Sequence, residues 1–228
     1  RSLSRSGPTT TRDFLLLNIL DNVAGRIEEL QYLGGQWQRR EVKAPFPGAL
    51  GAVGMYDPFV KDDPLANHYS MSYLDFLTPA SLYLGKAGSD ERELLKRNPT
   101  FFDGTGMRTE QRFATSKDGT QVPYFVVYPK GAKIDGTNPT VLYGYGGFQI
   151  SMTPFYSGGW GTTWLQRGGV FVVANIRGGG EFGPSWHQSA VKQNKQKSYD
   201  DFAAVAEDLI KAGITKPQHL GIMGGSNG

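Results

Sequence analysis

The stretch Gly224-Gly-Ser-Asn-Gly228 follows directly after the apolar run Leu220-Gly-Ile-Met223. Its pattern is G-x-S-x-G, and the run before it predicts a short strand of a buried sheet. A turn that exposes a serine hydroxyl at the end of a strand is too tight for large side chains on both sides of the serine, which explains the flanking glycines. The two segments together predict a strand-to-helix turn that presents Ser226.

The residues before this turn contain further strands. Thr140 to Tyr145 and Val170 to Asn175 are continuous apolar runs, which are typical of parallel strands buried on both faces, and Leu220 to Met223 is a third. Glu110 to Ser116 and Gln121 to Tyr128 predict a hairpin across Lys117-Asp-Gly119, because an Asp-Gly pair accepts the positive φ of a tight turn. After this hairpin, the sequence predicts strands that alternate with helices.

One helix is well signalled between the last two strands. Ser198 is predicted to cap it, with Asp201 three residues on, and Gly213 is predicted to end it. Its apolar face consists of Phe202, Val205, Ala206, Leu209 and Ile210. Strand, helix, strand and G-x-S-x-G, in this order, predict an α/β-hydrolase fold.

The first hundred residues have a different pattern, since short strands alternate with turns. Segments between Phe14 and Lys43 predict a β-meander, and a second group of strands follows between Ala49 and Gly85. The groups repeat after roughly 35 to 45 residues, the length of a four-stranded propeller blade. A β-sandwich would give a similar pattern, so the periodicity alone leaves both architectures open.

The composition is that of a globular protein and narrows the possible partners. Of 228 residues, 39% are hydrophobic and 20% are charged, and the absence of cysteine excludes disulfides, thiolate metal sites and a cysteine nucleophile. The same absence leaves a cytoplasmic or a periplasmic location open and favours the cytoplasm. The net charge of +3 comes from scattered residues, so we expect no nucleic-acid partner, and no apolar run is long enough to predict a membrane partner.

No cofactor or metal is expected, since His, Asp and Glu do not occur at metal-ligand spacing. Gly178 to Gly183 satisfies G-x-G-x-x-G after a predicted strand, as in a dinucleotide site. Such a site also needs an acidic residue at the end of the next strand, whereas Asp200-Asp201 begins the predicted helix. We interpret these glycines as a loop at the carboxyl end of a strand, held by an ion pair between Arg177 and Glu181.

Ser226 is the candidate nucleophile. A serine hydroxyl needs a base, an acid that orients the base, and hydrogen-bond donors for the negative charge that develops on the substrate carbonyl. The backbone N–H of Asn227 is one such donor in a G-x-S-x-G turn, and the Asn227 side chain is a candidate substrate contact. The second donor is expected from the loop Tyr143 to Phe148, whose glycines allow close approach to a ligand.

The acid and the histidine of such a site follow the serine in the chain order of this fold. We therefore expect both beyond residue 228, and we expect the 228 residues alone to be inactive. His68, His187 and His219 precede Ser226 and are interpreted as surface or capping residues.

Three motifs give a specific resemblance to a known family. Leu142-Tyr-Gly-Tyr-Gly-Gly-Phe148, Ala174-Asn-Ile-Arg-Gly-Gly-Gly-Glu181 and the turn at Ser226, in this order and spacing, are similar to those of the prolyl oligopeptidase family of serine peptidases. The likeness covers residues 110 to 228 and is looser before them. It implies that residues 1–105 are the C-terminal blades of a β-propeller. Residues 106–228 would then form the start of the α/β-hydrolase catalytic domain, with the N-terminal half of its sheet.

The resemblance also implies a role for each candidate residue. Ser226 would be the nucleophile, the Tyr145 hydroxyl and the Asn227 N–H the oxyanion donors, and Phe148 part of an apolar pocket for the residue before the cleaved bond. The implied activity is hydrolysis of short peptides after proline through an acyl-enzyme.

Two other functions stay open. An esterase or an acylaminoacyl-type peptidase would use the same machinery on another acyl group, because fold and catalytic residues do not determine the substrate. A non-enzymatic, propeller-like binding module would leave Ser226 idle and would lack the acid or the histidine later in the chain.

Overall fold

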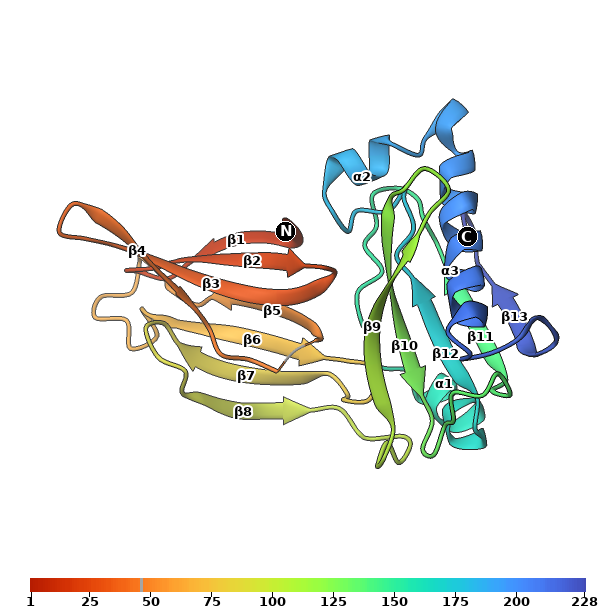
Figure 1. Ribbon diagram of the computed structural model, residues 1–228. Coiled ribbons are helices and arrows are strands. Elements are labelled where there is room, and N and C mark those ends of the chain that lie inside the picture. Colours follow the sequence, from red (N-terminus) through yellow and green to blue (C-terminus); the bar gives the residue numbers. More distant parts are fainter. Residues whose placement is uncertain (46) are drawn as a thin grey trace. The chain divides into compact units, whose positions relative to one another are not determined.

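The chain forms two compact units (Figure 1). The computed structural model describes residues 1–45 and 47–228. Unit 1 comprises Arg1–Pro99 with Thr153–Tyr156, and unit 2 comprises Thr100–Met152 with Ser157–Gly228. Every helix in the described residues is too short or too polar to cross a lipid bilayer.

Unit 1 is built from two four-stranded antiparallel sheets, in the orders β1-β2-β3-β4 and β5-β6-β7-β8. Their strands are β1 (Ser2–Thr10), β2 (Leu15–Asp21), β3 (Ala24–Leu33), β4 (Gln36–Glu41), β5 (Ala49–Gly54), β6 (His68–Leu74), β7 (Ser81–Lys86) and β8 (Arg92–Arg97). The predicted meander strands are confirmed, but β1 and β8 were not predicted. Both are polar edge strands, which carry no clear alternation of apolar residues.

The core of unit 1 lies between its two sheets. Leu16 and Ile27 from the first sheet pack with Ala52 and Met71 from the second, and all four are buried. Asn18 crosses this apolar layer, since its side chain donates to Ala52 O over 3.0 Å and accepts from Ala52 N over 2.7 Å. The two sheets are therefore joined by both apolar packing and a satisfied buried amide.

Unit 2 contains a five-stranded mixed sheet in the order β13-β11-β12-β10-β9. Its elements are β9 (Arg108–Thr115), β10 (Gln121–Tyr128), β11 (Thr140–Gly144), α1 (Gly158–Thr163), η1 (Leu165–Arg167), β12 (Val170–Ala174), α2 (Pro184–Gln188), η2 (Lys192–Asn194), α3 (Gln196–Lys211), η3 (Pro217–His219) and β13 (Leu220–Met223). β11 pairs in parallel with β12 and β13, and β9 pairs with β10 as a hairpin. The predicted hairpin and parallel strands are thus confirmed, with Gly119 at φ +86° in the turn.

Helices cover both faces of the central strands of this sheet. Val205 and Leu209 of α3 pack in one cluster with Val172 of β12. The neighbouring Phe171 points to the other face, where the Trp160 ring of α1 stacks on it with ring centroids 4.4 Å apart. All five residues of β12 are consequently buried, which explains its continuous apolar sequence.

Two predictions about unit 2 are wrong. β13 is not buried on both faces, because it is the edge strand of the sheet, and Ile222 is 70% exposed. Ser198 does not cap the predicted helix, because α3 already begins at Gln196 and Ser198 lies within its first turn. The end of α3 is as predicted, with Gly213 at φ +71° directly after the C-cap residue Ala212.

Candidate active site

The turn at Ser226 lies beside the loop that carries Tyr145. β11 and β13 are parallel neighbours with Tyr143 opposite Met223, so both chains leave the sheet at the same edge. We call residues 145–150, after β11, the Tyr145 loop, and residues 224–228, after β13, the serine turn. The Asn227 side-chain N–H donates to Tyr145 O over 2.6 Å, which ties the serine turn to the Tyr145 loop.

The approach of the two segments leaves no room for a side chain at the end of the serine turn. A Cβ atom on Gly228 would overlap the carbonyl oxygen of Gly144 at the end of β11. The last glycine of G-x-S-x-G is therefore required by close packing against the neighbouring strand.

Both segments hold residues in strained backbone conformations. Ser226 is exposed and has φ +56°, a region that non-glycine residues rarely occupy. Of the seven non-glycine residues with positive φ in the described part of the chain, three lie in these two segments: Phe148, Gln149 and Ser226. Such strain concentrates where a structure holds side chains for binding or chemistry, which makes this edge of the sheet the candidate active site.

The other predicted site residues differ in their burial. Tyr145 and Asn227 are half-buried and line a cavity of about 580 Å³ between α3 and the ends of β11 and β13. Phe148 is 73% exposed, and neither Phe148 nor Ser226 is among the residues that line this cavity. The structure thus brings Ser226, Asn227 and Tyr145 together and leaves Phe148 on the surface of the Tyr145 loop.

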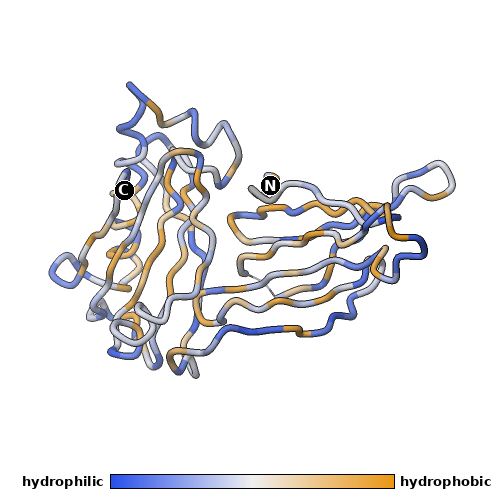
Figure 2. The backbone as a smooth tube through the Cα atoms, turned by 180° about the vertical axis from the view of Figure 1, so that it is seen from behind, coloured by the Kyte–Doolittle hydropathy of each residue, from blue (hydrophilic) through white to orange (hydrophobic). Residues whose placement is uncertain are grey.

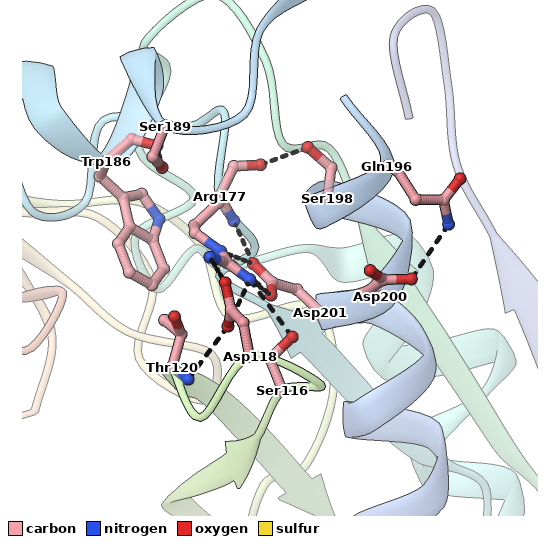
Figure 3. Close-up of polar contacts among 10 residues, drawn as sticks. All are labelled: Ser116, Asp118, Thr120, Arg177, Trp186, Ser189, Gln196, Ser198, Asp200 and Asp201. Carbon is pink, nitrogen blue, oxygen red and sulfur yellow. Dashed lines mark hydrogen bonds and ion pairs between the residues drawn. The ribbon is translucent and has the colours of Figure 1, made fainter. Parts of the chain in front are cut away.

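Arg177, which follows β12, is the centre of an ion-pair network in which Arg177 and Asp201 are buried and Asp118 is exposed (Figure 3). Its guanidinium donates to both carboxylate oxygens of Asp201 on α3, over 2.6 Å to one oxygen and 2.9 Å to the other. The backbone N–H of Arg177 donates to the same carboxylate over 2.9 Å. On the other side the guanidinium contacts Asp118 in the β9–β10 turn over 2.6 and 3.1 Å. Ser198 of α3 donates to Arg177 O over 2.7 Å. The network joins a hairpin turn, a helix and the loop after β12.

The electrostatics of this network follow from these hydrogen bonds. The bonds from Arg177 hold the pKa of the Asp118 carboxyl well below its usual range, and the bonds to Asp201 raise the pKa of Arg177. Asp118 and Arg177 therefore carry their charges at neutral pH. The expected pairing of Arg177 with Glu181 was wrong, because Asp118 and Asp201 occupy the guanidinium.

Glu181 has a separate role in the same loop. Its carboxylate accepts hydrogen bonds from Met152 N over 2.9 Å and from the Asn175 side chain over 3.4 Å. The side chain is almost completely buried, and this burial raises the pKa of Glu181 to about 7. Its charge therefore changes near neutral pH.

The described residues provide Ser226 with no histidine hydrogen-bond partner. His187 Nδ1 contacts Gly178 O at 2.6 Å, and His219 Nδ1 contacts Thr137 O at 2.9 Å. His219 also precedes β13, whereas Ser226 follows its other end. In residues 1–45 and 47–228, we find no group of three or more His, Asp or Glu side chains that could hold a metal ion.

Sequence reasoning missed three charged residues that support this edge of the sheet: Asp118, Lys195 and Asp201. Asp118 was assigned only to its turn and Asp201 to a helix cap, and Lys195 was given no role. Their contacts cross 24 to 59 positions of the chain, so no local pattern could have identified them.

The chain belongs to the prolyl oligopeptidase family. The family model described as "Prolyl oligopeptidase family" matches residues 156–228, which include the serine turn. An uncharacterised peptidase of Sinorhizobium fredii, y4nA, is 45% identical over 99% of this chain and 30% of its own length. The prolyl endopeptidase of Elizabethkingia miricola is 36% identical over 83% of this chain and 26% of its own length.

Solved structures agree with this assignment. The post-proline cleaving enzyme from Rickettsia typhi superposes with a TM-score of 0.79 at 38% identity, over 97% of this chain and 31% of that enzyme. The present chain thus spans less than a third of the length of these relatives.

Proposed function

We propose that this chain is part of a serine peptidase that hydrolyses short peptides on the carboxyl side of proline through an acyl-enzyme. The observation that carries the proposal is the bond from the Asn227 side chain to Tyr145 O, which joins a strained, exposed serine to a loop with a phenol donor. Proline specificity is supported by the names of the relatives, which include a prolyl endopeptidase and a post-proline cleaving enzyme.

In this proposal each site residue has one role. Ser226 Oγ attacks the carbonyl carbon of the scissile peptide bond while its proton passes to a base. The C–N bond then breaks as the base returns this proton to the leaving amine, and water hydrolyses the resulting acyl-enzyme. The Asn227 backbone N–H and the Tyr145 hydroxyl donate to the oxygen that becomes negatively charged. Phe148 contacts the side chain of the residue before the bond, and its exposure leaves its ring available for that contact.

The base and the acid that orients it are proposed to come from a part of the protein that follows Ser226. Two observations support this: the described histidines make no bond to Ser226, and the relatives are more than three times longer than this chain. In the fold of the serine turn, the acid and the histidine come after the serine in the chain.

We further propose that the two sheets of unit 1 are blades of a β-propeller and that unit 2 is the first part of an α/β-hydrolase domain. Four antiparallel strands per sheet and face-to-face packing of consecutive sheets fit the blade arrangement. In unit 2, the parallel strands β11, β12 and β13, with helices on both faces of the central strands and G-x-S-x-G directly after β13, fit the hydrolase sheet. A propeller would restrict the substrates to short peptides.

The test uses the complete protein that carries this chain. It is treated with a fluorophosphonate probe for active serines and assayed with a chromogenic Gly-Pro reporter peptide, with Ser226→Ala as the variant. Ser189→Ala, which removes a hydroxyl bonded to Trp186 O, is the matched control. We expect labelling at Ser226 and cleavage after proline in the wild type and the control, and neither in Ser226→Ala.

Two outcomes would change the proposal. Labelling of Ser226 without cleavage after proline would keep the serine hydrolase and move the substrate to esters or acyl-peptides. Absence of labelling in a folded complete protein would contradict catalysis by Ser226 and favour the binding module.

A further inference from the structure

Lys195 holds the peptide group next to Tyr145. Its ammonium donates to Gly146 O over 2.7 Å. One residue earlier, Tyr145 O accepts the bond from the Asn227 side chain over 2.6 Å. Two successive carbonyl groups of the Tyr145 loop are therefore held by side chains from two different elements, α3 and the serine turn.

Lys195 is itself well placed for this contact. It is the N-cap residue of α3, and its carbonyl accepts the bond from Ser198 N over 3.0 Å. The side chain is half-buried, and its ammonium lies 5.9 Å from the centroid of the Tyr199 ring. Burial lowers the pKa of Lys195, so the ammonium has lost part of its hydration, and Gly146 O replaces some of those lost bonds.

The other side of Gly146 is held by the loop after β12. Gly178 has φ +99°, and a Cβ atom on it would overlap Gly146 O, so the two backbones are in direct contact. Gly178 follows Arg177, whose backbone is bonded to Asp201 and Ser198 of α3. The N-terminal part of α3, with its N-cap residue, therefore supports the Tyr145 loop twice, directly through Lys195 and indirectly through Arg177.

We propose that Lys195 is a positioning residue that acts through Tyr145, and this rests on the oxyanion role of Tyr145 in the proposed function. By fixing the Gly146 peptide, Lys195 restricts the backbone from which the Tyr145 side chain projects. A hydrogen-bond donor to the oxyanion stabilises a charge that develops only in the transition state, so the donor must already be correctly positioned when the reaction begins. Loss of Lys195 therefore lowers turnover and leaves substrate binding nearly unchanged.

The experiment compares three variants of the complete protein on the proline reporter. Lys195→Met removes the ammonium and keeps an apolar side chain, and Lys195→Arg retains a cation and N–H donors. Lys197→Met is the matched control, since Lys197 lies on the first turn of α3 and is not among the residues that line the cavity. We expect Lys195→Met to lower kcat by about tenfold to hundredfold with KM within about threefold. Lys195→Arg should retain more activity than Lys195→Met, and Lys197→Met should match the wild type.

A double mutant separates positioning from a general structural role. If Lys195 acts through the Tyr145 hydroxyl, Lys195→Met should have little further effect in a Tyr145→Phe background, because the group that it positions is absent. The thermal midpoints of the single variants are measured alongside, and we expect them to agree with that of the wild type.

Three results would overturn the inference: an unchanged kcat in Lys195→Met, the same fold-loss with and without the Tyr145 hydroxyl, or a loss of kcat that follows a lowered thermal midpoint. In each case, Ser226-dependent cleavage by the wild type would show that the proposed function still stands. A wild type that neither cleaves the reporter nor reacts with the serine probe would instead contradict the proposed function, and the inference with it.

Discussion

The two units bury their strands in different ways. In unit 1, β6 alternates buried and less buried residues, because only one face of each sheet packs against the core between the sheets. In unit 2, β10 and β12 are buried almost throughout, because helices cover the sheet. Figure 2 shows the consequence, since hydrophobic colouring follows the inner strands of unit 2, whereas the outer strand β8 of unit 1 is mostly hydrophilic. Burial on one face or on two thus accounts for the two sequence patterns.

Buried charges also differ between the units. In unit 1, Glu29 of β3 is 2% exposed and accepts a hydrogen bond from Arg40 over 3.0 Å. Arg40 also forms an ion pair over 2.7 Å with Asp90, which precedes β8. This chain of ions joins one sheet to the other. In unit 2, Arg177 joins the loop after β12 to Asp201 of α3 and to Asp118 of the β9–β10 turn. Buried ions therefore hold sheets together in unit 1 and shape the candidate site in unit 2.

The largest effect is expected at the ion network of unit 2. Arg177→Met leaves the fully buried Asp201 carboxylate without its guanidinium, which we expect to destabilise unit 2 by about 3–5 kcal/mol. Turnover should fall at least about a hundredfold, because the loop after β12, which contacts the Tyr145 loop at Gly146, loses its support. Arg40→Met should destabilise unit 1 and leave turnover within about threefold.

Denaturant unfolding and the proline reporter assay measure these two effects. Arg167→Met, at an exposed position of unit 2, is the control and should match the wild type. Equal losses of turnover in Arg177→Met and Arg40→Met would contradict the distinction between a site network and a sheet-to-sheet network.

Truncation of one core side chain in each unit is expected to have the next largest effect on stability and to show whether the two units unfold separately. Leu142→Ala in β11 and Leu16→Ala in β2 each remove a fully buried side chain and should cost about 2–5 kcal/mol. Hydrogen exchange of the complete protein locates the loss. We expect faster exchange in unit 2 for Leu142→Ala and in unit 1 for Leu16→Ala, whereas acceleration of both units by either variant would show that they unfold together.

The buried carboxyl of Glu181 should make unit 2 sensitive to pH. Its pKa is raised from an ordinary 4.5 to about 7, so the folded state binds the proton more tightly than the unfolded state. The resulting stability is fully present below pH 4.5 and is lost as the pH rises toward 7, by at most about 3 kcal/mol.

Unfolding of wild type and Glu181→Gln between pH 4 and 8 tests this. The glutamine cannot ionise, so the variant should lack the decline of stability between pH 4.5 and 7. Glu207→Gln, at an exposed position of α3, is the control and should retain it. An identical dependence of the free energy of unfolding on pH in wild type and Glu181→Gln would contradict the prediction.

The smallest effect is expected at an exposed ion pair of unit 1. Arg12 and Asp13 contact each other over 3.0 Å, but their side chains are 53% and 41% exposed. Water screens such a pair, so Arg12→Met should leave the denaturant midpoint unchanged within error. A shift comparable to that of Arg177→Met would show that burial does not set the strength of ion pairs in this protein.

Local sequence patterns determined much of the fold of both units. Short strand-forming segments between turns identified the inner strands of unit 1, and Asp118-Gly119 identified the hairpin of unit 2, because strand and turn preferences depend on neighbouring residues. The same locality made the serine turn visible, since the G-x-S-x-G pattern is contained in five consecutive residues.

Only the tertiary structure decided which distant groups meet. Arg177 binds Asp201 and Asp118 rather than Glu181, and Ser198 bonds to Arg177 O rather than capping α3. The sequence by itself determined where strands and turns form and which serine is presented. The partners of its charged side chains depend on chain folding that brings segments 24 to 59 positions apart into contact, and no local preference encodes such contacts.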